Sequence, residues 1–87
     1  MEDIENRFQK ASEDVKLLPS KPGNQDLLSL YALYKQASEG DCTSEPPSGF
    51  DFKALAKYNA WNNLKGLSRE DAMKKYIALV DKLSNNH

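Results

Sequence analysis

Residues 24–39 contain the stretch that decides the fold: Asn24-Gln-Asp-Leu-Leu-Ser-Leu-Tyr-Ala-Leu-Tyr-Lys-Gln-Ala-Ser-Glu39. Its apolar residues recur three and four positions apart, which is the period of one face of an α-helix. These residues are Leu27, Leu28, Leu30, Tyr31, Tyr34 and Ala37. Asn24 is a residue type that caps helix N-termini, and Gly40 is a type that ends helices. The stretch therefore predicts an amphipathic helix over residues 24–39.

Tyr31, Tyr34 and Lys35 give this helix an unusual surface. Residues three and four apart are neighbours on a helix, so Tyr31 faces both Tyr34 and Lys35. Two phenol rings beside a fixed cation suit a ligand that combines a flat ring with an anionic group. The same stripe is also typical of the edge of a core, with the lysine stem lying along it. The residues of this stretch alone leave both interpretations open.

Three further amphipathic stretches complete the chain, and proline and glycine separate them. They cover residues 4–18, 51–65 and 68–84. The chain shows no strand-like alternation, no repeat and no low-complexity tract. The sequence therefore predicts an all-α fold, a single four-helix domain over residues 1–87.

The ends of these stretches carry helix start and stop signals. Pro19 stops the first stretch, because proline cannot continue a helix. Asp51 is a good N-cap for the third, with Phe50 and Leu55 placed as a hydrophobic staple. Ser68 opens the fourth as part of the capping box Ser68-Arg-Glu-Asp71.

The connections predict how the helices are arranged. The turns at residues 19–23 and 66–67 are short, which favours antiparallel neighbours for the first and second helices and for the third and fourth. The 40–50 connection is longer than usual, so we expect it to cross the bundle or to border a site. Its length also permits the second and third helices to run parallel. The predicted order is up-down-down-up.

Composition narrows the classes of function. Twelve basic and 13 acidic residues give a net charge of −1, which argues against nucleic acid as a partner. No segment approaches a membrane span, and the acidic N-terminus lacks the layout of a signal peptide, so we expect a cytoplasmic protein. Cys42 is the single cysteine, and the single histidine, His87, is the last residue. Without clustered ligands or a base beside a nucleophile, the sequence predicts no metal site and no catalytic residue.

The third helix repeats the pattern of the second. Lys57 lies four residues before Trp61, and Lys53 lies four before Lys57, so a line of cations borders an aromatic face. Such a line is usually a solvated flank. Tyr58 and Tyr76 add phenols on the third and fourth helices. Four phenols are hard to satisfy inside so small a bundle, which favours a ligand or an open groove beside some of them.

Blocks that run from Phe8 to about Leu83 resemble one known family. They read Phe8-Gln-Lys-Ala-Ser-Glu-Asp-Val15, Tyr31-x-x-Tyr-Lys-Gln-Ala37, Gly40-Asp41, Asp51-Phe-Lys53, Ala56-Lys57, Ala60-Trp-Asn62 and Leu64-Lys-Gly-x-Ser-x-Glu-Asp-Ala-Met73. The chain is similar to the acyl-CoA-binding protein (diazepam-binding inhibitor) family. The resemblance implies a skewed up-down-down-up four-helix bundle. It also implies a non-catalytic protein that binds long- and medium-chain fatty acyl-CoA esters as an intracellular pool former and transporter.

The resemblance implies ligand contacts for residues singled out above. They are Lys16, Tyr31, Tyr34, Lys35, Lys57 and Tyr76. Lys35, Lys57 and Tyr31 match the residues that hold the 3′-phosphate of coenzyme A, and Tyr34 matches an aromatic that stacks on adenine. The acyl chain is expected in a groove against Leu28, Phe52 and Lys53.

Some positions depart from the family's usual pattern. Tyr58 stands where the family commonly has tryptophan, and Leu55 where it often has lysine or another polar residue. The segment 45–49 carries a second proline and a shifted glycine. These differences leave the preferred chain length and the shape of the loop open.

Two other classes of function compete with a carrier. A module whose groove holds a peptide helix needs few cations beside its aromatics, so Lys35 and Lys57 disfavour it. An enzyme, or a domain appended to one, is disfavoured by the lack of an internal histidine. We therefore expect a monomer that binds a fatty acyl-CoA ester without a cofactor. Neither nucleic acid binding nor stable membrane insertion is expected, and contacts with membranes or acyl-CoA-using enzymes are expected to be transient.

Overall fold

The computed structural model describes residues 3–47, 49 and 51–85. They form the helices α1 (Ile4–Asp14), α2 (Asn24–Glu39), α3 (Phe52–Asn62) and α4 (Arg69–Asn85), and a 3-10 turn, η1 (Val15–Leu17), directly after α1. No strand occurs within these described ranges. The predicted all-α class is confirmed.

Two of the predicted helix starts are confirmed. Asp51 accepts a hydrogen bond from the Ala54 N–H at 3.0 Å, and Ser68 Oγ accepts one from the Asp71 N–H at 3.0 Å. Each bond satisfies a backbone donor that has no partner inside the helix. The predicted staple residue Phe50 lies outside the described residues.

The predicted cap of α2 is wrong. Asn24 is the first residue of the helix, and Gly23 occupies the N-cap position without a side-chain bond. The helix begins there because the Leu27 N–H donates to the Gly23 carbonyl at 2.9 Å, which closes the first turn.

The first and third helices end earlier than predicted. Helix α1 ends at Asp14, and η1 carries the chain only to Leu17. Leu18 is extended, with φ −61° and ψ 138°, because a residue before proline avoids the helical region. Helix α3 ends at Asn62, and residues 63–66 form turns that finish at Gly66 with a φ of 95°. This left-handed conformation favours glycine, and it redirects the chain toward α4.

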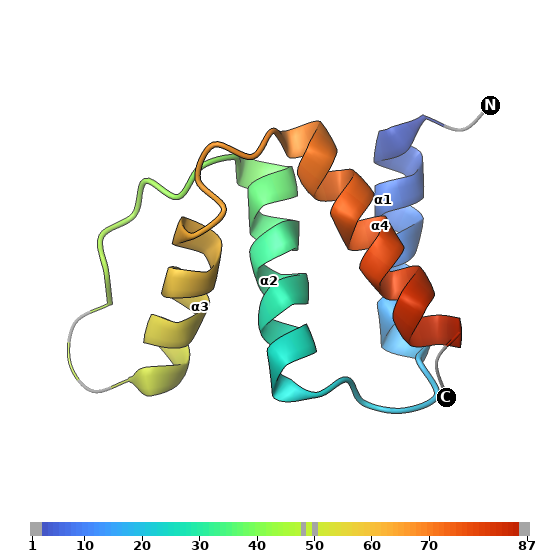
Figure 1. Ribbon diagram of the computed structural model, residues 1–87, viewed down its shortest axis with the longest axis horizontal. Coiled ribbons are helices and arrows are strands. Elements are labelled where there is room, and N and C mark those ends of the chain that lie inside the picture. The colour runs from blue at the N-terminus through green and yellow to red at the C-terminus, as the bar shows by residue number, and fades with distance from the viewer. Residues whose placement is uncertain (1–2, 48, 50, 86–87) are drawn as a thin grey trace.

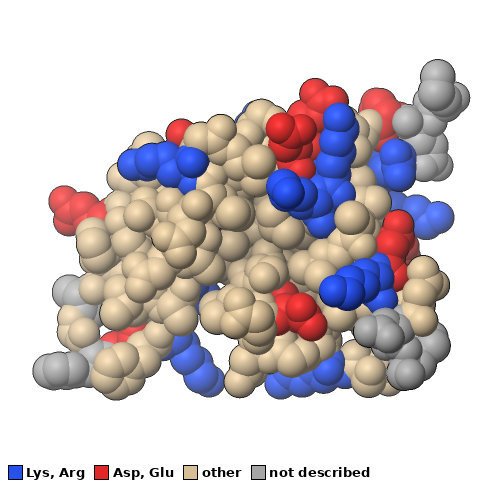
Figure 2. Space-filling model, viewed as in Figure 1, with Lys and Arg blue, Asp and Glu red and all other residues tan. Residues whose placement is uncertain are grey.

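The four helices follow the predicted up-down-down-up order, with α2 and α3 parallel (Figure 1). The pairs expected to be antiparallel neighbours do run antiparallel, but they are not the main packing partners. Helix α2 packs against α3 and α4, and α1 packs against α4. The reason is the apolar face of α4, which buries five residues, whereas α3 buries one. On the face shown in Figure 2, charged side chains are frequent over α4 and sparse over α2 and α3.

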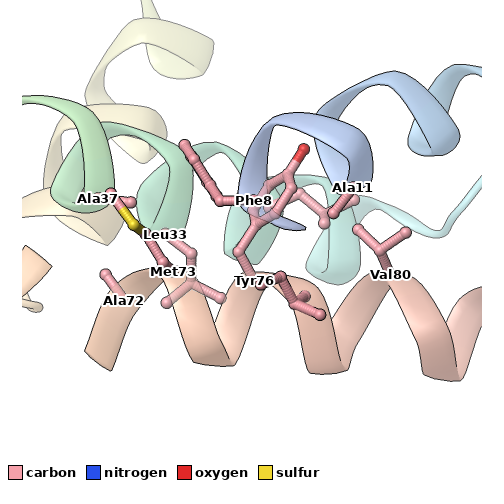
Figure 3. Close-up of a cluster of buried hydrophobic side chains, with 10 residues drawn as sticks. Phe8, Ala11, Leu33, Ala37, Ala72, Met73, Tyr76 and Val80 are labelled. Atoms are coloured by element: carbon pink, nitrogen blue, oxygen red, sulfur yellow. The ribbon is translucent and has the colours of Figure 1, made fainter. Parts of the chain in front are cut away.

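The core lies where α1, α2 and α4 meet. It consists of Phe8, Ala11, Leu30, Leu33, Ala37, Ala72, Met73, Tyr76, Ile77 and Val80, most of which appear in Figure 3. Helix α3 instead joins a smaller cluster with Ala32, Cys42 and Trp61. The packing of α3 is therefore concentrated near its C-terminal end.

A buried amide ties the C-terminal end of α2 to the connection between α3 and α4. Gln36 is fully buried, and its Nε2 donates to Asp41 Oδ1 at 2.8 Å and to the Leu67 carbonyl at 2.7 Å. Asp41 Oδ1 also accepts from the Gly66 N–H at 2.9 Å. The bonds from Gly66 and then Gln36 lower the pKa of Asp41, because both favour its charged form. We call these four residues the Gln36 latch.

Candidate ligand-binding site

A cavity of about 350 Å³ opens between α2, α3 and the connection that joins them. Tyr31 and Lys35 of α2 and Lys57 of α3 line it. These three residues are 22 to 26 positions apart between the two helices, and the parallel packing of α2 on α3 brings them together. We call this space the cationic cavity.

Each lysine of the cationic cavity lies over an aromatic ring. Lys57 Nζ is 5.4 Å from the centroid of the Tyr31 ring, and Lys35 Nζ is 4.9 Å from that of Trp61. Attraction between an ammonium and the face of a ring helps to hold the cation in place. Both ammonium groups are thus positioned at the wall of one cavity, which suits a multiply charged anion.

Lys35 has a second partner. Its ammonium pairs with Glu39, one turn further along α2. The hydrogen bond to Glu39 is the main reason that the pKa of Lys35 is raised, so this lysine remains charged near neutral pH. Glu39 therefore competes for the same ammonium that an anionic ligand would contact.

Trp61 forms part of the cavity wall and is itself fixed by the fold. Its side chain is 7% exposed, and Nε1 donates to the Gly40 carbonyl at 2.9 Å. Gly40 ends α2 and is followed directly by Asp41 of the Gln36 latch. The wall of the cavity is thus anchored to the same turn that closes α2.

A second cavity, of about 470 Å³, adjoins the N-terminal ends of α2 and α3. Leu28, Phe52 and Lys53 all line it, together with Leu27, Ala56 and Lys21. Phe52 is 76% exposed, an unusual state for a phenyl ring with no partner to cover it. We call this space the apolar groove.

Lys57 lines both the cationic cavity and the apolar groove. The two spaces are therefore neighbours, with an ammonium at their junction. A ligand that fills both needs an anionic part next to a long apolar part. This is the arrangement of an amphipathic anion.

Tyr34 and Tyr76 lie apart from these two cavities, in an aromatic cluster with Phe8. The Phe8 ring centroid is 5.4 Å from that of Tyr34 and 5.1 Å from that of Tyr76. Tyr76 points from α4 into the core and is buried (Figure 3), and burial raises the pKa of its hydroxyl, with a smaller effect of Tyr34. Tyr34 is 43% exposed, so part of its ring remains free to stack on a ligand.

Lys16 is the most isolated of the predicted site residues. It is exposed in η1 and lines neither the cationic cavity nor the apolar groove. The structure therefore gathers the nine predicted residues into three groups and one single position. The groups are Tyr31, Lys35 and Lys57; Leu28, Phe52 and Lys53; and Tyr34 with Tyr76.

Part of the cavity walls could not be predicted residue by residue from the sequence. Ser44, Glu45 and Pro47 line the cationic cavity, so the 40–50 connection borders this cavity. Their roles as wall residues depend on the path of this connection, which no periodicity reports. Lys21 of the apolar groove was missed for the same reason, since it lies in a turn.

Fold and cavities together define an all-α binding protein for an amphipathic anion. Among the described residues, no group of histidine, cysteine and carboxylate side chains is arranged to hold a metal ion. None of the described helices combines the length and apolar character needed to cross a bilayer.

Comparison with known proteins identifies the class more narrowly. The family model "Acyl CoA binding protein" matches residues 5–80, and the chain belongs to this acyl-CoA-binding protein family. An acyl-CoA-binding protein of Dictyostelium discoideum is 50% identical over 80 residues, which cover 92% of this chain and 95% of that protein. The crystal structure of Oryza sativa acyl-CoA-binding protein 2 superposes with a TM-score of 0.90 at 38% identity, covering 95% of this chain and 92% of that one.

The same domain also occurs within a larger protein. Enoyl-CoA delta isomerase 2 of Rattus norvegicus is 51% identical over 79 residues, which cover 91% of this chain and 20% of the isomerase. The similarity is thus confined to one part of that enzyme.

Proposed function

We propose that this chain binds long- and medium-chain fatty acyl-CoA esters and carries them without catalysing a reaction. The observation that supports this most directly is the junction at Lys57, where the cationic cavity adjoins the apolar groove. A fatty acyl-CoA ester has phosphates at one end and hydrocarbon at the other, and so matches both spaces. Membership in the acyl-CoA-binding protein family supports the same ligand.

The phosphates belong in the cationic cavity in this proposal. Lys35 and Lys57 hold the 3′-phosphate as point charges, and the Tyr31 hydroxyl completes the contact. The adenine stacks on the exposed part of the Tyr34 ring, an interaction worth ~1–3 kcal/mol by analogy with nucleic acid bases. Tyr76 supports the Tyr34 ring from the side of the core, and their ring centroids are 6.0 Å apart. Lys16 adds a further charge from η1.

The acyl chain belongs in the apolar groove. Leu28 and Phe52 supply its walls, and the stem of Lys53 lies along its edge. Each buried methylene contributes ~0.8 kcal/mol, so chain length strongly affects affinity. The bound acyl chain also covers the Phe52 ring, which is exposed to water in the free protein.

The proposal extends to the context of this binding. Residues 1–87 act as one acyl-CoA-binding domain that works as a cytoplasmic monomer. It keeps an intracellular pool of the esters and delivers them through transient contacts with membranes or acyl-CoA-using enzymes. Neither a cofactor nor a metal ion takes part.

Calorimetric titration with palmitoyl-CoA tests the binding function. We expect a one-to-one complex, and much weaker binding of free palmitate, because palmitate cannot fill the cationic cavity. Coenzyme A alone should also bind more weakly, because it leaves the apolar groove empty. Equal affinity for palmitate and palmitoyl-CoA would contradict a site built for both ends of the ligand.

Replacing Lys57 tests the phosphate site. We expect Lys57→Met to weaken palmitoyl-CoA binding by about 1.5–3 kcal/mol, the typical contribution of a charged hydrogen bond. The apolar stem is kept, so helicity should not change, and loss of the contact with the Tyr31 ring should lower the free energy of unfolding by no more than about 0.5–1 kcal/mol. Lys75→Met, on the exposed surface of α4, is the matched control and should bind normally.

A second ligand completes the test of this contact. The wild-type chain should bind 3′-dephospho-palmitoyl-CoA more weakly than palmitoyl-CoA. The Lys57→Met variant should lose less affinity than the wild-type chain when the 3′-phosphate is removed. Equal losses in the two proteins would place the phosphate elsewhere.

A further inference from the structure

A third cavity, of about 410 Å³, lies between α2 and α3 and has no charged residue in its wall. Its floor is apolar, with Leu33 and Leu64, and polar side chains such as Asn59 and Asn63 stand at its edge. We call it the neutral cavity. Charged side chains are sparse over α2 and α3 on the face shown in Figure 2. The absence of charge from the wall argues against a phosphate or carboxylate as its occupant and favours hydrocarbon.

The neutral cavity shares two wall residues with the apolar groove. Leu28 and Ala56 line both spaces, one from each helix. Each is half-buried. Ala56 carries only a methyl group, so little side chain separates the two spaces on the α3 side, and the Leu28 side chain forms the boundary on the α2 side. Helices α2 and α3 also diverge toward their N-terminal ends, where the apolar groove lies (Figure 1). The apolar surface therefore continues from the groove into the neutral cavity.

We propose that the neutral cavity receives the terminal methylenes of long acyl chains, which enter it from the apolar groove past Leu28 and Ala56. This inference rests on the proposed binding of acyl-CoA esters. Medium chains are held by the apolar groove alone, and longer chains continue into the second space. Along α2 the neutral cavity extends from Gln25 to Leu33, roughly 12 Å at 1.5 Å per residue, which is room for several methylenes.

Filling the neutral cavity tests the proposal. Ser29 on α2 and Ala60 on α3 line the neutral cavity but neither the cationic cavity nor the apolar groove. The variants Ser29→Phe and Ala60→Phe are titrated with octanoyl-, dodecanoyl-, palmitoyl- and eicosanoyl-CoA. Gln9→Phe, on the exposed surface of α1, is the control for adding a phenyl ring, and thermal unfolding checks that each variant is folded.

The expected result is a loss that depends on chain length. Both variants should bind octanoyl-CoA like the wild-type chain and lose affinity for eicosanoyl-CoA by roughly tenfold or more. Each methylene is worth about fourfold in affinity, so excluding two of them is sufficient for this effect. Unchanged binding of eicosanoyl-CoA in both variants would overturn the proposal.

A measurement on the unmodified chain locates the end of the acyl chain directly. Stearoyl-CoA with a nitroxide near its terminal carbon broadens the NMR signals of nearby amides. We expect the strongest broadening at Ser29, Asn59 and Asn63. The proposal is wrong if the strongest effect falls on Lys21 and Asn24, at the outer end of the apolar groove. If both phenylalanine variants weaken the binding of all esters equally, this NMR measurement decides whether the acyl chain reaches the neutral cavity.

These outcomes are separate from a failure of the proposed function. If the wild-type chain binds none of the esters, acyl-CoA carriage itself is wrong. If it binds them all but the signals near the neutral cavity remain unaffected, only the route of the acyl chain is wrong.

Discussion

Helix α2 takes part in two regions that differ in how completely their apolar residues are covered. Toward α1 and α4 it joins a core of ten buried residues, in which Tyr76 and Val80 are 3% and 2% exposed. Toward α3 it borders the apolar groove and the cationic cavity, and there Phe52 is 76% exposed and Leu27 37% exposed. One region is closed by the protein itself, whereas the other leaves apolar side chains uncovered where the proposed ligand would lie.

The difference shows how a small chain separates stability from recognition. Burial in the core supplies the favourable free energy of folding, because it removes apolar surface from water. Helix α3 buries only Trp61 and gives up part of this stabilisation. What it gains is apolar surface next to two cations, which is available for binding. The folding energy should therefore depend on one region and the affinity on the other.

The largest expected effect is on the free energy of unfolding, when one residue in each region is replaced by alanine. Ile77→Ala removes a buried core side chain and should lower the free energy of unfolding by about 2–5 kcal/mol. Phe52→Ala removes an exposed side chain and should change it by less than about 0.5 kcal/mol. Urea unfolding of both variants measures the contrast.

Binding should show the opposite ranking. Phe52→Ala should weaken palmitoyl-CoA binding by roughly 1.5 kcal/mol, the lower end for burying a large apolar side chain. Ile77→Ala, measured where it is still folded, should bind normally. A large loss of stability in Phe52→Ala would show that the two regions are not separate.

A smaller effect, which depends on pH, should come from the Gln36 latch. The pKa of Asp41 is lowered from 3.8 in the folded protein, so its contribution to stability is present above that value and is lost as the pH falls through the folded pKa. Asp41→Asn keeps an oxygen acceptor but removes the charge. This variant should be less stable than the wild-type chain near neutral pH, and the difference should shrink as the solution becomes acidic.

Urea unfolding at about pH 6 and about pH 3 compares the two proteins across this window. A difference that is the same at both pH values would show that the charge of Asp41 has no part in the latch. Asp81→Asn, on the exposed surface of α4, is the control for a general loss of negative charge.

The smallest expected effect concerns Glu39. Because Glu39 pairs with Lys35 in the free protein, an incoming phosphate must displace it. Glu39→Gln should therefore bind palmitoyl-CoA roughly twofold more tightly, since helix pairs of this spacing contribute only about 0.3–0.5 kcal/mol. Titrations at low salt measure the change, and Glu70→Gln, whose partner is Lys74, is the control. Weaker binding by Glu39→Gln would mean that Glu39 positions Lys35 for the ligand instead of competing with it.

Much of the fold could be predicted from local patterns. The helical spacing of Phe8 and Ala11, and of Met73 and Ile77, marked faces that are buried in the structure. The length of the 40–50 connection permitted the parallel direction of α2 and α3, which the structure shows. Periodicity does not say which helix covers a face, however. For this reason the packing of α4 on both α1 and α2 was not found.

The candidate site was predictable to a similar degree. Tyr31, Lys35 and Lys57 lie on helices, so their spacing in the sequence predicted which face of its helix each residue occupies. The family resemblance predicted that the faces of the two helices come together. Wall residues on irregular segments, such as Glu45 and Lys21, have no periodicity that could reveal them. The separate position of Lys16 follows from the packing of α1 on α4, away from the cavities at α2 and α3, which a pattern of apolar residues cannot predict.

The position of Trp61 makes this residue an intrinsic fluorescence probe. The chain has a single tryptophan, so its tryptophan fluorescence comes from one known place. That indole lines the cationic cavity beneath Lys35 and is bonded to the turn that closes α2. Its emission therefore responds to an arriving anion and to loosening of the turn, without any added label. A shift on titration at constant pH reports the first event, and a shift on unfolding reports the second.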